Sequence, residues 1–154
     1  MLVYDSTPTI VVQDSVLADD LCQYIITFAK DAGPKPNLIA SNGKNIRDEM
    51  RTSNGIGMDF GEDAVIEIVL RIMKRTAFVH NEDLPKSTRL EECGNRAVTI
   101  IGCLNDSDAA TVFPHLGLGI QSMQGRVIMF GNLDEDKEPH PLSMHMGTTP
   151  REGE

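Results

Sequence analysis

The residues of this sequence best suited to hold a metal ion are its histidines. There are four of them: His80, His115, His140 and His145. A non-haem iron site uses two imidazoles and one carboxylate on one face of the metal, which leaves positions open for a substrate and for O₂. Residues two apart on a strand project from the same face, so strand alternation can aim a ligand into a β-barrel. His145 alternates with Ser143 and Gly147, and we interpret it as the strongest candidate metal ligand.

The other histidines have simpler explanations in their surroundings. His140 stands between two prolines in an acidic stretch, and His115 follows a Phe-Pro pair, so both are expected at the solvated surface. His80 and Glu82 form a nominal His-x-Glu pair, but they follow a helical pattern within a polar stretch that has no strand alternation. They are therefore only substitute ligands. The sequence has no nucleophile elbow, phosphate loop, Cys-x-x-Cys or dinucleotide-type glycine fingerprint.

Composition and charge exclude several classes of function. The chain has 154 residues, and its 14 Lys plus Arg against 23 Asp plus Glu give a formal charge of −9. This balance offers no electrostatic footprint for nucleic acid and is unsuited to an anionic membrane surface. No apolar run reaches the roughly 18 residues of a membrane span, and no secretory leader opens the sequence. Three cysteines without metal spacing indicate free thiols, so we predict a cytoplasmic protein.

Two helices are predicted in the first half of the chain. Asp14 and Ser15 offer N-caps for the first helix, which ends near Gly33. Glu62 and Asp63 open the second helix. The expected apolar stripes are Leu21, Ile25 and Phe28 in the first helix and Val65, Ile68, Val69 and Ile72 in the second. Each stripe needs an apolar sheet face to cover it.

Short strands dominate the rest of the prediction. One strand precedes the first helix at residues 9–12. The others are expected at residues 97–104, 111–113, 119–122, 126–130 and 142–146. Helices followed by short strands are typical of an α+β fold, with two helices supporting one face of a β-sandwich or jelly roll. The length favours one domain over residues 1–154.

The order of motifs resembles the catalytic domain of prolyl 4-hydroxylases. The resemblance opens with the strand and helix start of residues 10–22 and continues with Arg-Thr-Ser-Asn-Gly at residues 51–55. The second helix matches the family at residues 62–75. Later segments follow in the family order: residues 95–106, 111–114, 125–130, 142–147 and 153–154. Each motif is weak alone, but their order extends over nearly the whole chain.

This resemblance implies an enzyme that uses Fe(II), O₂, 2-oxoglutarate and L-ascorbate to hydroxylate prolyl or similar residues in a peptide or protein. It implies a double-stranded β-helix of the cupin type with two supporting N-terminal helices. It also implies that His145 is the distal iron ligand, because this residue occupies the histidine of the family's Ser-Leu-His-x-Gly motif.

The sequence departs from the family at two places that matter for catalysis. The strand that carries the family's His-x-Asp pair has no counterpart, since residues 84–94 contain neither His nor Asp. On the order of thirty residues are missing there, enough for about two strands and their turn. The last residue, Glu154, stands one position before the family's Lys that pairs with 2-oxoglutarate. The predicted fold is therefore incomplete, with an exposed sheet edge through which a homodimer could form.

Two functional hypotheses remain open from the sequence. The first is a prolyl hydroxylase of the Fe(II)- and 2-oxoglutarate-dependent class. The second is a catalytically incompetent or fragmentary jelly-roll module that acts by binding a partner. By motif the chain keeps one of three iron ligands, His145, and a single imidazole cannot form a facial triad. His80 and Glu82 are the residues that would have to replace the missing pair.

Overall fold

The computed structural model describes residues 1–4, 7–36, 38–41, 44–47, 54–56, 63–79 and 97–151. Its helices are α1 (Asp19–Ala32), α2 (Ala64–Val79) and the short 3₁₀ turns η1 (Pro114–Leu116) and η2 (Pro141–Ser143). The strands before α2 are β1 (Leu2–Tyr4), β2 (Ile10–Gln13), β3 (Lys35–Pro36), β4 (Leu38–Ser41), β5 (Lys44–Arg47) and β6 (Asn54–Gly55). The later strands are β7 (Val98–Gly102), β8 (Ala110–Phe113), β9 (Leu118–Gln121), β10 (Val127–Gly131) and β11 (Met146–Gly147).

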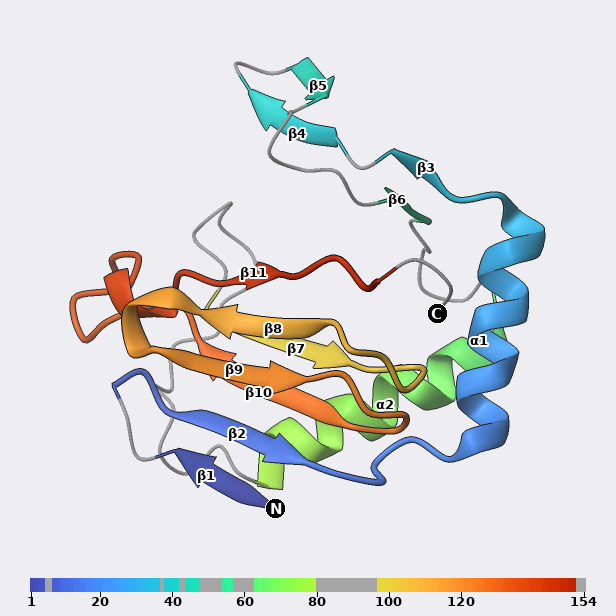
Figure 1. Ribbon diagram of the computed structural model, residues 1–154, viewed down its shortest axis with the longest axis horizontal. Coiled ribbons are helices and arrows are strands. Elements are labelled where there is room, and N and C mark those ends of the chain that lie inside the picture. The colour runs from blue at the N-terminus through green and yellow to red at the C-terminus, as the bar shows by residue number, and fades with distance from the viewer. Residues whose placement is uncertain are drawn as a thin grey trace.

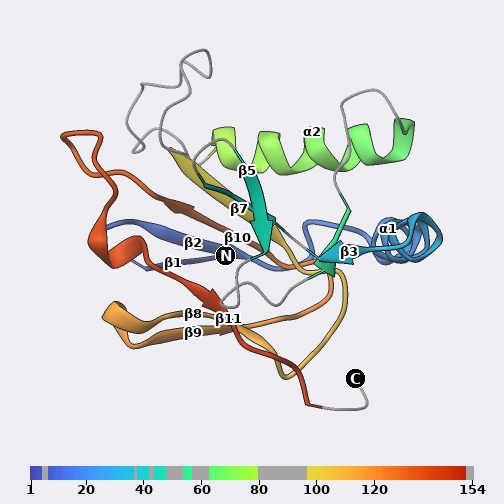
Figure 2. The same cartoon turned by 90° about the horizontal axis from the view of Figure 1, so that it is seen from above.

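Two antiparallel sheets make up the centre of the molecule (Figure 1). The larger sheet has the strand order β1-β2-β10-β7, and the smaller one has the order β11-β8-β9. Figure 2 shows three layers, with α2 on one side of the larger sheet and the smaller sheet on the other. Two further pairs, β3 with β6 and β4 with β5, form small sheets of their own. The α+β class predicted from the sequence is confirmed.

Strand alternation divides the apolar residues between the two faces of the larger sheet. One face meets the smaller sheet in a cluster of buried residues: Ile10, Val12, Cys103, Phe113, Ile120, Ile128 and Phe130. The other face meets the helices, and Leu17, Cys22, Val69 and Val127 are buried there. Adjacent residues of β7 separate in the same way, because Ile101 packs against the first cluster and Ile100 against the second. The sheet is therefore apolar on both faces.

The helix starts show one correct and one wrong prediction. In α2, the Asp63 carboxylate accepts hydrogen bonds from Val65 N at 2.8 Å and Ile66 N at 3.0 Å, so Asp63 caps the helix at the start expected from the sequence. In α1, the expected caps were wrong, since the helix begins at Asp19 after Ala18. Asp14 is instead paired with Arg126 across the molecule.

The predicted stripe of α2 was right in its later part, since Val69 and Ile72 pack against the larger sheet as expected, and wrong at Ile68. Ile66 and Val69 are buried, whereas Ile68 is 50% exposed. The same helix face carries Met73, which packs with Val69 against the larger sheet. Positions three and seven residues after Ile66 share its face, so Ile66 belongs to the buried stripe and the predicted Ile68 does not.

Candidate functional site

His145 lies between η2 and β11, close to where β8 and β10 end. The predicted strand at residues 142–146 was wrong, because Pro141 opens the 3₁₀ turn η2 and only Met146 and Gly147 join the sheet. The His140 side chain accepts a hydrogen bond from Leu142 N and caps this turn. Local capping therefore overrode the alternation seen in the sequence. His145 directly precedes the strand instead of belonging to it.

The imidazole of His145 packs against two buried aromatic rings. Its centroid is 4.6 Å from that of Phe130, at 68°, and 6.0 Å from that of Phe113, at 42°. These phenylalanines come from β10 and β8, one from each sheet of the sandwich. The residue itself is exposed. The ring therefore covers the end of the apolar core while remaining accessible, and we call this region the His145 end of the sandwich.

One ring nitrogen of His145 is engaged and the other is available. Nδ1 lies 2.9 Å from the carbonyl oxygen of Ser143. A carbonyl oxygen can only accept, so Nδ1 donates, and in the neutral ring Nε2 carries a lone pair. Metal-binding histidines commonly donate their second ring nitrogen to a backbone carbonyl in this way. The geometry suits His145 as one metal ligand.

A complete iron site is not formed by the residues that the structure describes. Within them there is no group of three or more His, Cys, Asp or Glu side chains that could hold a metal ion. The described donors therefore do not fit the facial triad that Fe(II) requires. The substitute ligands His80 and Glu82 lie outside the described residues. Among the described residues, His145 is the one candidate ligand that the sequence singled out.

The two remaining described histidines do not join His145. His115 is exposed on η1, in agreement with its expected surface position. His140 is half-buried and caps η2, a structural role that the sequence analysis missed. The order His140-Pro141-Leu142 could have predicted this cap, because a polar side chain just before Pro at the start of a turn is a typical cap position.

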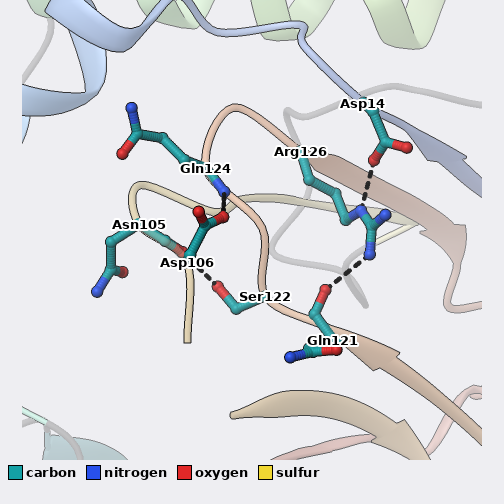
Figure 3. A network of polar contacts seen from close by, with 7 residues as sticks. All are labelled: Asp14, Asn105, Asp106, Gln121, Ser122, Gln124 and Arg126. Carbon is teal, nitrogen blue, oxygen red and sulfur yellow. Dashed lines mark hydrogen bonds and ion pairs between the residues drawn. The ribbon is translucent and has the colours of Figure 1, made fainter. Parts of the chain in front are cut away.

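The opposite end of the sandwich holds a polar network, drawn in Figure 3. Arg126 Nε lies 2.6 Å from Asp14 Oδ1, and its Nη1 donates to Gln121 O at 2.9 Å. The hydrogen bond from Arg126 lowers the pKa of the Asp14 carboxyl, with the charge of Arg126 acting in the same direction. Ser122 Oγ, in the turn between β9 and β10, donates to Asn105 O, in the connection between β7 and β8, at 3.0 Å. We call this region the Arg126 end.

Every polar contact named at the Arg126 end joins one part of the fold to another. Gly125 O accepts from Val16 N at 2.9 Å and from Leu17 N at 3.2 Å, and Gly125 N donates to Cys103 O at 2.9 Å. The first two bonds connect the turn between β9 and β10 to the segment between β2 and α1, and the third connects it to the residue that follows β7. These contacts give the network a structural role in joining the parts of the fold.

Comparisons with known proteins confirm the resemblance to prolyl 4-hydroxylases. A curated relative, the probable prolyl 4-hydroxylase 4 of Arabidopsis thaliana, is 24% identical over 195 residues, which covers 97% of this chain. The chain spans 65% of the length of that relative. The alignment is 195 residues long and this chain has 154, so at least 41 aligned positions of the relative have no residue of this chain opposite them. No protein-family model matches the chain.

Two solved structures share the fold. The viral collagen prolyl hydroxylase vCPH of Paramecium bursaria Chlorella virus-1, in its 2OG complex, aligns with a TM-score of 0.64 at 17% identity, covering 92% of this chain and 87% of that one. A Pseudomonas putida prolyl-4-hydroxylase aligns with a TM-score of 0.56 at 16% identity, covering 81% and 80% of the two chains.

Proposed function

We propose that residues 1–154 form a prolyl 4-hydroxylase-like dioxygenase domain, dependent on Fe(II) and 2-oxoglutarate, that hydroxylates a prolyl or similar residue in a peptide or protein. The observation that carries the proposal is His145. The residue at the position of the family's distal ligand is held over the core by Phe130, with Nδ1 bound and Nε2 available. The shared fold of the viral and bacterial hydroxylases supports the same conclusion.

The two packed sheets support an incomplete double-stranded β-helix as the architecture of this domain. Among the described strands, β7 pairs with β10 alone and β11 pairs with β8 alone. The 41 or more unmatched positions of the plant relative are in keeping with missing strands. An edge left without partners presents unpaired N–H and C=O groups.

The proposed cofactors follow from the same class. The 2OG complex of the viral hydroxylase supports 2-oxoglutarate as the co-substrate. Fe(II) would take His145 as a ligand, with His80 and Glu82 as the substitute candidates for the rest of the triad. L-Ascorbate is proposed from the resemblance alone. Fe(II) supplies the O₂ chemistry of this enzyme class when it is bound.

A second candidate function follows from the ligands that the described residues offer. Since the described residues contain no group of three metal-binding side chains, the chain could serve as a catalytically incompetent module that binds a peptide without turnover. A single imidazole leaves the other protein positions of the metal to water, and residues around a ligand cannot replace ligands that are absent.

Succinate release separates the two functions. We would supply the purified chain with Fe(II), ascorbate, 2-oxoglutarate and a Pro-rich peptide, and compare it with His145→Ala and with Ser122→Ala. The control removes a hydroxyl at the Arg126 end, far from the proposed ligand. Release lost only in His145→Ala supports the dioxygenase, and parallel His80→Ala and Glu82→Ala variants would identify the other ligands. No release from the folded wild-type chain would contradict the enzyme and favour the binding module.

We also propose that two copies of the chain can pair through the outer edge of β7. Asn132 N donates to Ala97 O at 2.8 Å and Cys103 N to Arg126 O at 2.8 Å, so odd-numbered residues of this strand face β10. Val98, Ile100 and Gly102 therefore direct their backbone groups toward the outer edge. Sedimentation at rising concentration tests this pairing, and a monomer throughout would contradict it.

None of the helices that the structure describes has the length and apolar character of a membrane span.

A further inference from the structure

We propose that Ser143 is a positioning residue that holds the imidazole of His145 in one tautomer, with the proton on Nδ1 and the lone pair on Nε2. The use of that lone pair as a ligand rests on the proposed function. The tautomer itself is a property of the metal-free chain, so it can be tested separately from any activity.

The first step of the argument is the direction of the bond between the two residues. His145 Nδ1 and Ser143 O are 2.9 Å apart, and only the ring nitrogen can carry the proton of this bond. The contact is partly buried, although the residue as a whole is exposed. Partial burial strengthens a hydrogen bond relative to one in open water.

The second step is a contrast with His140 in the same segment. Leu142 N lies 3.1 Å from His140 Nδ1, and a backbone N–H can only donate. The neutral ring of His140 therefore carries its proton on Nε2, the opposite of His145. Two neighbouring histidines thus have opposite tautomers, because their backbone partners differ in kind.

The third step is the anchoring of Ser143. It is the one buried polar residue among the described side chains, at 8% exposure. Its Oγ donates to His140 O at 2.7 Å and lies 3.4 Å from Asn132 O, while its N donates to His140 O at 2.9 Å. Asn132 in turn donates from Nδ2 to Thr99 Oγ1 at 2.8 Å, on strand β7. The carbonyl that faces His145 is therefore tied to the larger sheet.

The fourth step concerns the ring of His145. Phe130 meets it edge to face at 4.6 Å, and Phe113 lies at 6.0 Å on the other sheet. Buried aromatic neighbours restrict how far the imidazole can turn away from the Ser143 carbonyl. Packing and the hydrogen bond therefore act together on one orientation.

The test is a measurement of histidine tautomers by nitrogen and carbon NMR of the metal-free chain at about pH 8.5, where histidine side chains in general are neutral. His145→Gln and His140→Gln assign the two rings. We expect Nδ1–H for His145 and Nε2–H for His140 in the same spectrum. A wild-type His145 that carries its proton on Nε2 would overturn the proposal without any variant.

The role of the Ser143 hydroxyl is tested by substitution. Ser143→Ala removes the Oγ hydrogen bond that anchors the Ser143 carbonyl. The ratio of the Nε2–H form of His145 to its Nδ1–H form should then rise about fivefold, which is the change in an equilibrium that one ordinary hydrogen bond produces. Ser143→Thr keeps a hydroxyl and should restore most of the wild-type ratio. Ser122→Ala, which removes an equivalent bond to a backbone carbonyl at the Arg126 end, should leave His145 unchanged. A folded Ser143→Ala chain with an unaltered ratio would overturn the assignment of Ser143.

Discussion

The two ends of the sandwich differ in what their polar groups are used for. At the Arg126 end, the ion pair with Asp14 and the backbone bonds of Gly125 connect segments that are distant in sequence. At the His145 end, the hydrogen bonds of Ser143 hold one ring and leave its second nitrogen available. The contacts at the Arg126 end join distant segments, whereas those at the His145 end fix the orientation of one imidazole. The comparison shows that a dense set of polar contacts can serve the fold alone.

The largest effect should come from removing the aromatic support of the His145 end. Phe130 is 1% exposed and contacts both Phe113 and His145. Phe130→Ala should lower the free energy of unfolding by about 4 kcal/mol, because it deletes buried apolar surface and leaves a cavity. Urea denaturation measures this. A loss under about 1 kcal/mol would show that the ring does not belong to a packed core.

A somewhat smaller loss is expected from Gly125→Ala at the Arg126 end. Gly125 has φ +77°, and a Cβ built there would collide with Leu17 O. The strain and the forced backbone shift together should cost about 3 kcal/mol. Gly117→Ala is the matched control, since Gly117 has φ +60° but no atom within 4 Å of a built Cβ. Equal losses in the two variants, measured by urea denaturation, would show that only the backbone angle matters.

The smallest effect is a pH dependence of stability at the Arg126 end. The hydrogen bond from Arg126 lowers the pKa of Asp14 in the folded chain, so the pair stabilises at pH above the unfolded value of about 3.9 and is lost as the pH falls through the folded value. Asp14 is half exposed, so the pair should contribute about 0.5 kcal/mol.

The matching variant makes this pH dependence measurable. Asp14→Asn should be less stable than the wild type near pH 6, and the difference should shrink as the pH falls below the unfolded value of about 3.9, as followed by urea denaturation at each pH. A difference that stays constant across this range would show that the ion pair contributes nothing that titrates.

Local signals in the sequence predicted the parts of the fold that depend on neighbouring residues. Asp63 caps α2 as expected, because its partners are two and three residues away. The strands β7 and β10 were predicted from their apolar runs. The Asp14–Arg126 pair spans 112 positions of the chain, and no local pattern reports such a contact. The expected N-cap Asp14 takes part in this pair, and α1 begins at Asp19.

The role of His145 as a ligand stays a prediction, and its local geometry differs from the one expected from the sequence. His145 was found from its alternation and from the family motif, yet it precedes the strand on which it was placed. The proline at position 141 and the cap from His140 form a turn that alternation alone does not reveal. The anchoring of Ser143 through Asn132 depends on a contact between β7 and the segment after β10, which only the folded chain brings together.

The most direct test of the account is a Mn²⁺ titration followed by amide NMR, with Mn²⁺ as an air-stable substitute for Fe(II). The account predicts paramagnetic broadening at the His145 end, centred on the amides next to His145 and lost in His145→Gln. Ser122→Ala should leave this broadening unchanged. Broadening that persists in His145→Gln, or that centres on the Arg126 end, would contradict the claim that His145 is the metal ligand.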